Sequence, residues 1–197
     1  MRLEVLCNEV NHPEILACIF ESASKRVDQI CTPSGIIPRI DETFIREHCS
    51  FSAIVDFPYG ISETRIRVHE ILLCHKRGVK TIDLVLNRYD LESANLNAIR
   101  KDFRTCYAAS KTHGLALRPV VEYRVAEGAF IADLSYSLQE NGASELVLGT
   151  GAMVDDIIDN IICSKNIEDK LGMGVVSCSP ILSQEHYELF HDSKIHG

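Results

Sequence analysis

Seven short apolar runs recur along this sequence, separated by longer amphipathic stretches. The runs are rich in Val, Ile and Leu and show little alternation, which is typical of strands buried on both faces of a parallel sheet. We therefore predict strands at Leu3–Cys7, Gln29–Thr32, Ser52–Phe57, Thr81–Asn87, Ala116–Glu122, Glu145–Gly149 and Met173–Ser177.

The intervening stretches have the apolar spacing of helices. We predict helices at Glu63–Arg77, Leu96–His113, Ala129–Asn141, Val154–Lys165 and Gln184–His191. Gly78, Gly114 and Gly142 stand where three of these helices should end, which is the usual place for a C-terminal cap.

Strand–helix alternation of this kind gives either an open doubly wound sheet or a closed barrel. Periodicity does not separate the two, but no glycine-rich fingerprint follows the first run, which disfavours a dinucleotide-binding sheet. We expect an α/β protein with a TIM-type (β/α) barrel. No linker-like or low-complexity tract interrupts residues 1–197, so we expect a single domain.

The strand count raises a question, because a complete barrel of this type has eight strands. Only about seven runs are recognisable. Three explanations stay open: the barrel is incomplete, a partner subunit supplies the missing edge, or the first strand is misplaced. Because an open parallel edge invites aggregation, we expect a homo-oligomer that covers it.

Composition narrows the classes of partner. The net charge of −8 argues against nucleic acid, although a local pocket can still bind a small phosphorylated or carbonyl ligand. No stretch approaches the roughly 20 apolar residues of a membrane span, and no signal peptide is visible, so we expect a cytoplasmic location and no membrane partner. The eight cysteines form no Cys-x-x-Cys pair, and we predict neither a metal nor a cofactor.

In a barrel, functional side chains lie at the carboxyl ends of the strands. Asp83 is the most informative, because it lies inside an apolar run and a buried carboxylate needs partners. It is either a general acid or base, or a structural acid bound to backbone amides or to Arg124. Glu122 is a similar catalytic candidate, and Cys31 is a weaker one as a thiol near a strand end.

Further residues at strand ends are candidates for ligand binding. Arg124 has the geometry to hold an anionic group or simply neutralises the nearby carboxylates. The backbone of Gly149-Thr150-Gly151 precedes a predicted helix and is suited to cradle a phosphate, or it is a plain turn. Asn87 and Ser177 complete the predicted ligand-binding set.

One long ungapped segment resembles the deoxyribose-phosphate aldolase family. That family has an F-P-x-G turn, a helix with a central Glu and a G-A-D-E-I-D-x-V-I-N strand. Here the matching residues are Phe57-Pro58-Tyr59-Gly60, Glu70 and the run from Gly78 to Asn87. Weaker matches include Cys31-Thr32-Pro33-Ser34, Val120-Val121-Glu122 and Gly142-Ala143. Together they cover roughly residues 1–182.

The resemblance implies a barrel and a Schiff-base aldol reaction on a 2-deoxy sugar phosphate. It also shows what this chain lacks. The family's lysine nucleophile lies in a K-T-S-T-G motif, which reads Val147-Leu148-Gly149-Thr150-Gly151 here, so Val147 occupies the nucleophile position. The family's second lysine falls at Val176 or a neighbour. Valine cannot form an imine, which needs a primary amine.

Three hypotheses about function follow. In the first, the protein has lost class I aldolase activity and acts as a binding or scaffold subunit, as a pseudoenzyme does. In the second, it is an enzyme with altered chemistry on a small carbonyl or phosphorylated substrate, using Asp83, Glu122 and Arg124. In the third, the lysine is misaligned and the protein is an active carbon–carbon lyase.

Overall fold

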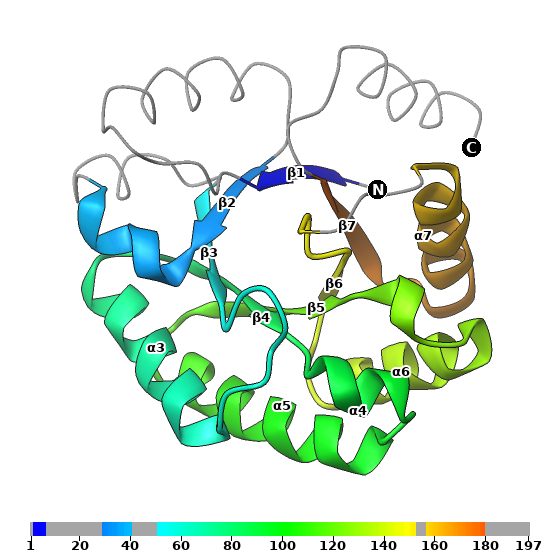
Figure 1. Ribbon diagram of the computed structural model, residues 1–197, viewed down its shortest axis with the longest axis horizontal. Coiled ribbons are helices and arrows are strands. Elements are labelled where there is room, and N and C mark those ends of the chain that lie inside the picture. Colours follow the sequence, from blue (N-terminus) through cyan, green and yellow to red (C-terminus); the bar gives the residue numbers. More distant parts are fainter. Residues whose placement is uncertain (1, 7–28, 41–50, 153–156, 180–197) are drawn as a thin grey trace.

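The structure is a computed structural model that describes residues 2–6, 29–40, 51–152 and 157–179. Its seven strands are all parallel and follow one another around a closed barrel in sequence order (Figure 1). They are β1 (Arg2–Leu6), β2 (Gln29–Pro33), β3 (Phe51–Val55), β4 (Thr81–Val85), β5 (Ala116–Val121), β6 (Glu145–Leu148) and β7 (Gly174–Ser179). The TIM-type (β/α) architecture predicted from the apolar runs is confirmed.

The barrel closes between its first and last described strands. Arg2 of β1 is in register with Val176 of β7, and Leu3 is in register with Ser177. The strand edge that we expected to lie open after the seventh strand is therefore paired within the chain. This pairing removes the physical reason for expecting a homo-oligomer, although the oligomeric state itself stays a prediction.

Helices surround the barrel on the outside. They are η1 (Ser34–Arg39), α3 (Thr64–Lys76), α4 (Arg88–Glu92), α5 (Leu96–Thr112), η2 (Tyr123–Val125), α6 (Gly128–Glu140) and α7 (Ile157–Leu171). The predicted boundaries of α3, α5 and α6 are confirmed to within one residue at each end. Helix α7 runs six residues further than predicted, whereas positions 154–156 and the predicted helix Gln184–His191 lie outside the described residues.

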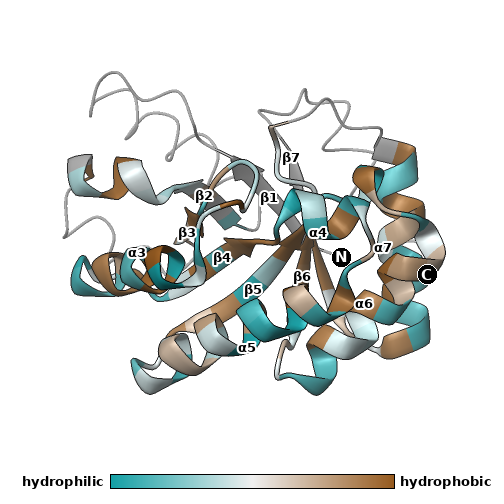
Figure 2. Cartoon of the chain, turned by 60° about the horizontal axis from the view of Figure 1, so that its bottom comes forward, coloured by the Kyte–Doolittle hydropathy of each residue, from teal (hydrophilic) through white to brown (hydrophobic). Residues whose placement is uncertain are grey.

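The strands with described side chains, β2 to β7, divide their apolar residues between two cores. Outward residues such as Ile82 and Leu84 pack against helix residues such as Ile71 and Phe103, and all four are buried. In Figure 2, β4 and β6 carry mostly the brown colour of hydrophobic residues. Inward residues form a second, smaller cluster inside the barrel. Burial on both faces explains why the strands are continuous apolar runs in the sequence.

The predicted glycine caps follow their helices. Gly78, Gly114 and Gly142 have φ angles of 90°, 68° and 103°, a left-handed conformation that glycine adopts at little cost. In the part of the chain that the structure describes, no helix combines the length and the apolar character that a bilayer crossing requires.

Candidate functional site

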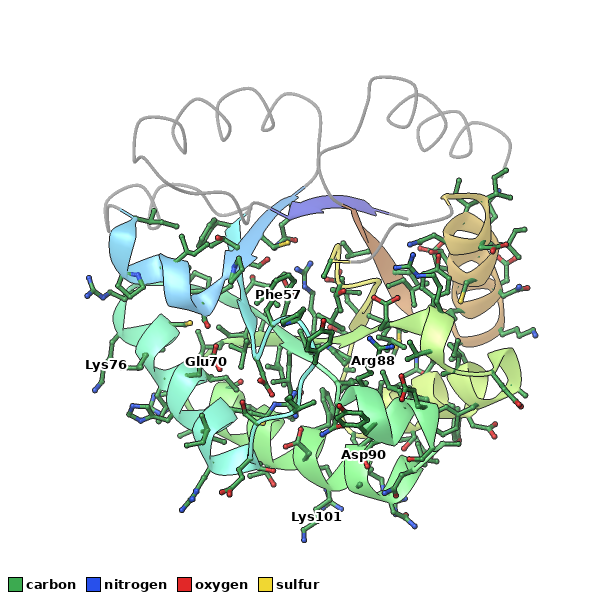
Figure 3. The ribbon with its side chains drawn as sticks, viewed as in Figure 1. Phe57, Glu70, Lys76, Arg88, Asp90 and Lys101 are labelled. Atoms are coloured by element: carbon green, nitrogen blue, oxygen red, sulfur yellow. The ribbon has the colours of Figure 1, made fainter. Side chains whose placement is uncertain are left out.

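An apolar layer lies across the barrel interior. It consists of one buried side chain from each of six consecutive strands, Cys31, Ile54, Val85, Val120, Val147 and Val176. Val147 and Val176 are each 1% exposed. Phe57, which follows β3, packs against this layer and lies near the barrel centre in Figure 3. The two positions where the resemblance places lysines therefore lie in a close-packed apolar environment.

A buried polar cluster lies next to the apolar layer, on the side of the amino ends of the strands. Its members are Gln29, Ser52, Asp83 and Arg118, each two residues before an apolar-layer residue on the same strand. Because side chains alternate along a strand, a two-residue step keeps these four in the barrel interior. The apolar layer therefore separates the cluster from the carboxyl ends of the strands, where the barrel mouth lies.

The cluster is built around an ion pair. Arg118 donates from Nε to Asp83 Oδ1 at 2.7 Å, and its Nη2 lies 2.6 Å from the same oxygen. Its Nη1 donates to Gln29 Oε1 at 2.7 Å. The Ser52 hydroxyl donates to the other carboxylate oxygen of Asp83. The carboxylate is fully buried, and these partners offset the free-energy cost of removing it from water.

The partner of Asp83 differs from the one we considered. For a structural Asp83 we considered backbone amides or Arg124 as partners. The structure instead pairs Asp83 with Arg118 on the neighbouring strand, where the two residues are in register. Sequence reasoning missed Arg118, Ser52 and Gln29. Arg118, like Asp83, is a charged residue inside an apolar run. The same reasoning that selected Asp83 could therefore have selected Arg118.

A second polar group lies at the carboxyl ends of β5 and β6. Glu122 is buried and accepts hydrogen bonds from Arg124 Nε at 3.0 Å and from Thr150 Oγ1 at 3.0 Å. The Arg124 guanidinium also lies over the Tyr123 ring, with its Cζ 5.6 Å from the ring centroid. The structure thus brings together Glu122, Arg124 and Thr150, three of the predicted site residues.

The backbone amides of the predicted phosphate loop are largely engaged. Gly149 N donates to Val121 O at 2.9 Å, Thr150 N donates to Glu122 Oε2 at 3.3 Å, and Ala152 N donates to Thr150 Oγ1 at 3.2 Å. The carboxylate of Glu122 beside this loop also disfavours an anion there. Gly149 and Gly151 have positive φ angles of 81° and 72°, which suit a tight turn.

The remaining predicted residues have mainly structural surroundings. Asn87 caps α4, because its Oδ1 accepts from Tyr89 N at 2.9 Å and from Asp90 N at 3.3 Å. Cys31 is fully buried in the apolar layer, where a thiol packs as a small hydrophobic group. Ser177 belongs to β7, but its side chain lies outside the described residues.

The segment that carries the family resemblance is held by a network of contacts. Arg67 of α3 is buried and donates to Val85 O, at the end of β4, and its Nη1 pairs with Asp102 of α5. Its Nε lies 3.4 Å from Asp56 Oδ2, just after β3. Glu70, the central Glu of the motif, accepts from Asp56 N at 3.3 Å. This part of the resemblance therefore has a structural explanation that needs no catalysis.

The lysines that the structure describes are all exposed, on helices or in the turn before β4. They are Lys76, Lys80, Lys101, Lys111, Lys165 and Lys170. Lys25 and Lys194 lie outside the described residues. Within the described residues, no cluster of His, Cys, Asp and Glu is arranged to hold a metal ion.

The fold defines the class: this is a (β/α)-barrel protein. No family model matches the chain. It is 22% identical over 147 residues to a deoxyribose-phosphate aldolase of Streptococcus agalactiae, covering 75% of this chain and 65% of the relative. A deoxyribose-phosphate aldolase of Desulfitobacterium hafniense matches at 22% over 144 residues, 73% of this chain and 62% of the relative. The chain thus spans less than two thirds of these relatives.

Solved structures give the same result for the fold. A tetrameric deoxyribose phosphate aldolase from Aeropyrum pernix superposes with a TM-score of 0.78 at 16% identity, covering 95% of this chain and 80% of that one. QR15, described as an aldolase, gives 0.70 at 13% identity, covering 98% and 96%. These matches confirm the resemblance read from the sequence: the chain is similar to deoxyribose-phosphate aldolases in sequence and in fold.

Proposed function

We propose that this protein has no class I aldolase activity and acts as a binding or scaffold subunit with an aldolase-like barrel. The observation that carries the proposal is the apolar layer around Val147. A Schiff base requires a primary amine whose pKa is lowered by burial or by a neighbouring cation. At the aligned position this chain has an aliphatic side chain packed among others.

The surroundings of Val147 support the same conclusion. Val176, at the position of the family's second lysine, belongs to the same layer. Asp83 is engaged by Arg118 and Ser52 on the other side of that layer, so it is not positioned to serve a reaction at the barrel mouth. Together these residues resemble a barrel core more than a catalytic centre.

Borohydride trapping tests the proposal. The protein is incubated with acetaldehyde or with 2-deoxyribose 5-phosphate, reduced with sodium borohydride, and measured by intact mass and peptide mapping. We expect no site-specific adduct on the wild-type chain. The Val147→Lys variant is the positive control, because it places an amine at the aligned position.

A specific adduct on the wild-type protein would contradict the proposal. Peptide mapping would then identify the reacting lysine, including Lys25 and Lys194, which lie outside the described residues. Random modification of the exposed lysines is separated from imine catalysis by comparing the rates of adduct formation among the lysines.

A second candidate function is altered chemistry at the mouth, favoured by the buried Glu122 beside Arg124 and Thr150. Of the residues first considered for such chemistry, Asp83 is sequestered, which leaves Glu122 and Arg124. A thermal-shift screen against sugar phosphates and keto acids tests this candidate, because a specific ligand stabilises the folded state by mass action. A shift that Glu122→Gln abolishes would favour the second candidate over the first.

A further inference from the structure

The outward face of α5 is positively charged on a protein whose net charge is −8. We define the α5 strip as Asn97, Arg100, Lys101, Arg104, Thr105, Ala108 and Lys111, all of which are exposed. Its four cations lie on one helix face. Figure 3 shows Lys101 pointing outward at the rim of the molecule. The helix has one acid, Asp102, and it faces away from the strip.

The acids near the strip are engaged elsewhere. Asp102 accepts from Thr64 Oγ1 at 2.6 Å and pairs with Arg67. Before the helix, Asp90 accepts from Asn95 Nδ2 at 3.1 Å, and Glu92 pairs with Arg88 at 2.7 Å. Within the described residues, the cations of the strip therefore lack an ion-pair partner.

The clustering of cations on one face lowers the stability of α5 as a helix. Arg100 and Arg104 are four residues apart, and like charges at that spacing destabilise a helix. The only side-chain hydrogen bond described for either is from Arg100 Nη2 to Asn97 Oδ1 at 2.8 Å. A face with these properties is stabilised when an anionic partner neutralises it.

The strip also has room for a partner's side chains. A depression of about 600 Å³ that is open to solvent lies on the strip, lined by Asn97, Arg100, Lys101, Arg104, Thr105 and Ala108. From Asn97 to Lys111 the strip is about 21 Å long, at a rise of about 1.5 Å per residue. An acidic helix of about four turns, or a shorter extended segment, matches that length.

We propose that the α5 strip is the docking surface for an acidic segment of a partner protein. The inference deepens the proposed function and rests on it, since it gives the binding subunit a specific face. A short acidic segment covers the strip alone, whereas a nucleic acid extends its phosphate backbone beyond it, over a surface that is acidic overall.

Fluorescence anisotropy tests this proposal with a labelled, Glu-rich helical peptide of about fourteen residues. The wild-type protein is compared with Lys101→Glu/Arg104→Glu. A matched control, Lys165→Glu/Lys170→Glu, makes the same charge change on α7, where both lysines are exposed. We expect the strip variant to raise the Kd at least about tenfold while the control changes it little, and we expect binding to weaken with salt.

Circular dichroism and thermal melting show that each variant is folded. Two results would overturn the proposal: no binding of the peptide to the wild-type protein, or equal weakening by the strip and control variants. A duplex RNA of the same charge that displaces the peptide at lower concentration would overturn the choice of a protein partner. Imine trapping is independent of this surface, so failure of peptide binding and failure of the proposed loss of aldolase activity are distinguishable.

Discussion

Asp83 and Arg118 form an ion pair inside the barrel, with 2.6 Å between Asp83 Oδ1 and Arg118 Nη2. The two residues are register partners on β4 and β5. Both are almost completely inaccessible to solvent, Asp83 at 0% and Arg118 at 3% exposed. The pair therefore belongs to the core of the barrel, below the apolar layer that contains Val147.

Arg118→Met should lower the free energy of unfolding by about 3–5 kcal/mol, because it leaves the Asp83 carboxylate buried without its cation. Urea denaturation measures the change. The double variant Asp83→Asn/Arg118→Met should lose less free energy of unfolding than Arg118→Met alone, because it also removes the unpaired charge. A loss below about 1 kcal/mol in the single variant would mean that the pair contributes little to the core.

Gly60→Ala should be far more destabilising than Gly114→Ala. Both glycines have a positive φ, 64° and 68°. At Gly60, however, an added Cβ would lie 2.5 Å from Val85 O, whereas at Gly114 nothing lies within 4 Å. We expect Gly114→Ala to lower the free energy of unfolding by about 1–2 kcal/mol, from backbone conformation alone, and Gly60→Ala to lower it clearly more. Equal losses in thermal or urea unfolding would contradict this.

Two buried thiols make the fold sensitive to alkali. Burial raises the pKa of Cys74 and of Cys106 from the ordinary value of 9.0 to about 12, and the nearby carboxylates Glu70 and Asp102 add to the respective effects. Because the unfolded chain loses these protons first, their contribution to stability is complete below about pH 9. It is lost as the pH rises toward about 12.

The free energy of unfolding should therefore fall above pH 9, by up to about 1.4 kcal/mol per pH unit for each thiol. Cys106→Ala should show a shallower fall than the wild-type protein, in denaturation curves recorded from pH 8 to 10.5. An unchanged slope in this variant would show that other groups cause the alkaline sensitivity.

The Thr150 hydroxyl links the ends of β5 and β6 through Glu122. Thr150→Val keeps the side-chain shape but removes a hydrogen-bond donor to a buried carboxylate. We therefore expect the free energy of unfolding to fall by about 1–3 kcal/mol. Thr105→Val on the exposed face of α5 is the control and should change stability by less than about 0.5 kcal/mol. Equal effects of the two substitutions would indicate that the Glu122–Thr150 contact is not stabilising.

Much of the architecture was readable from the amino-acid order. Continuous apolar runs predicted the strands because both faces of each strand are buried, and glycines marked the ends of helices because they adopt left-handed conformations. The family motif around Phe57-Pro58-Tyr59-Gly60 predicted the barrel. Asp83 was recognised as a buried acid from its position inside an apolar run, which is a local property.

The tertiary structure decided which residues meet. Arg118 is Asp83's partner because two strands distant in sequence are in register, and no local pattern states that register. Closure of the barrel between β1 and β7 likewise depends on strand curvature and pairing over nearly the whole chain, which apolar periodicity does not encode. The sequence, through its resemblance to the aldolases, predicts that Val147 occupies the position of their lysine nucleophile. Only the folded barrel shows that this valine is surrounded by other apolar side chains.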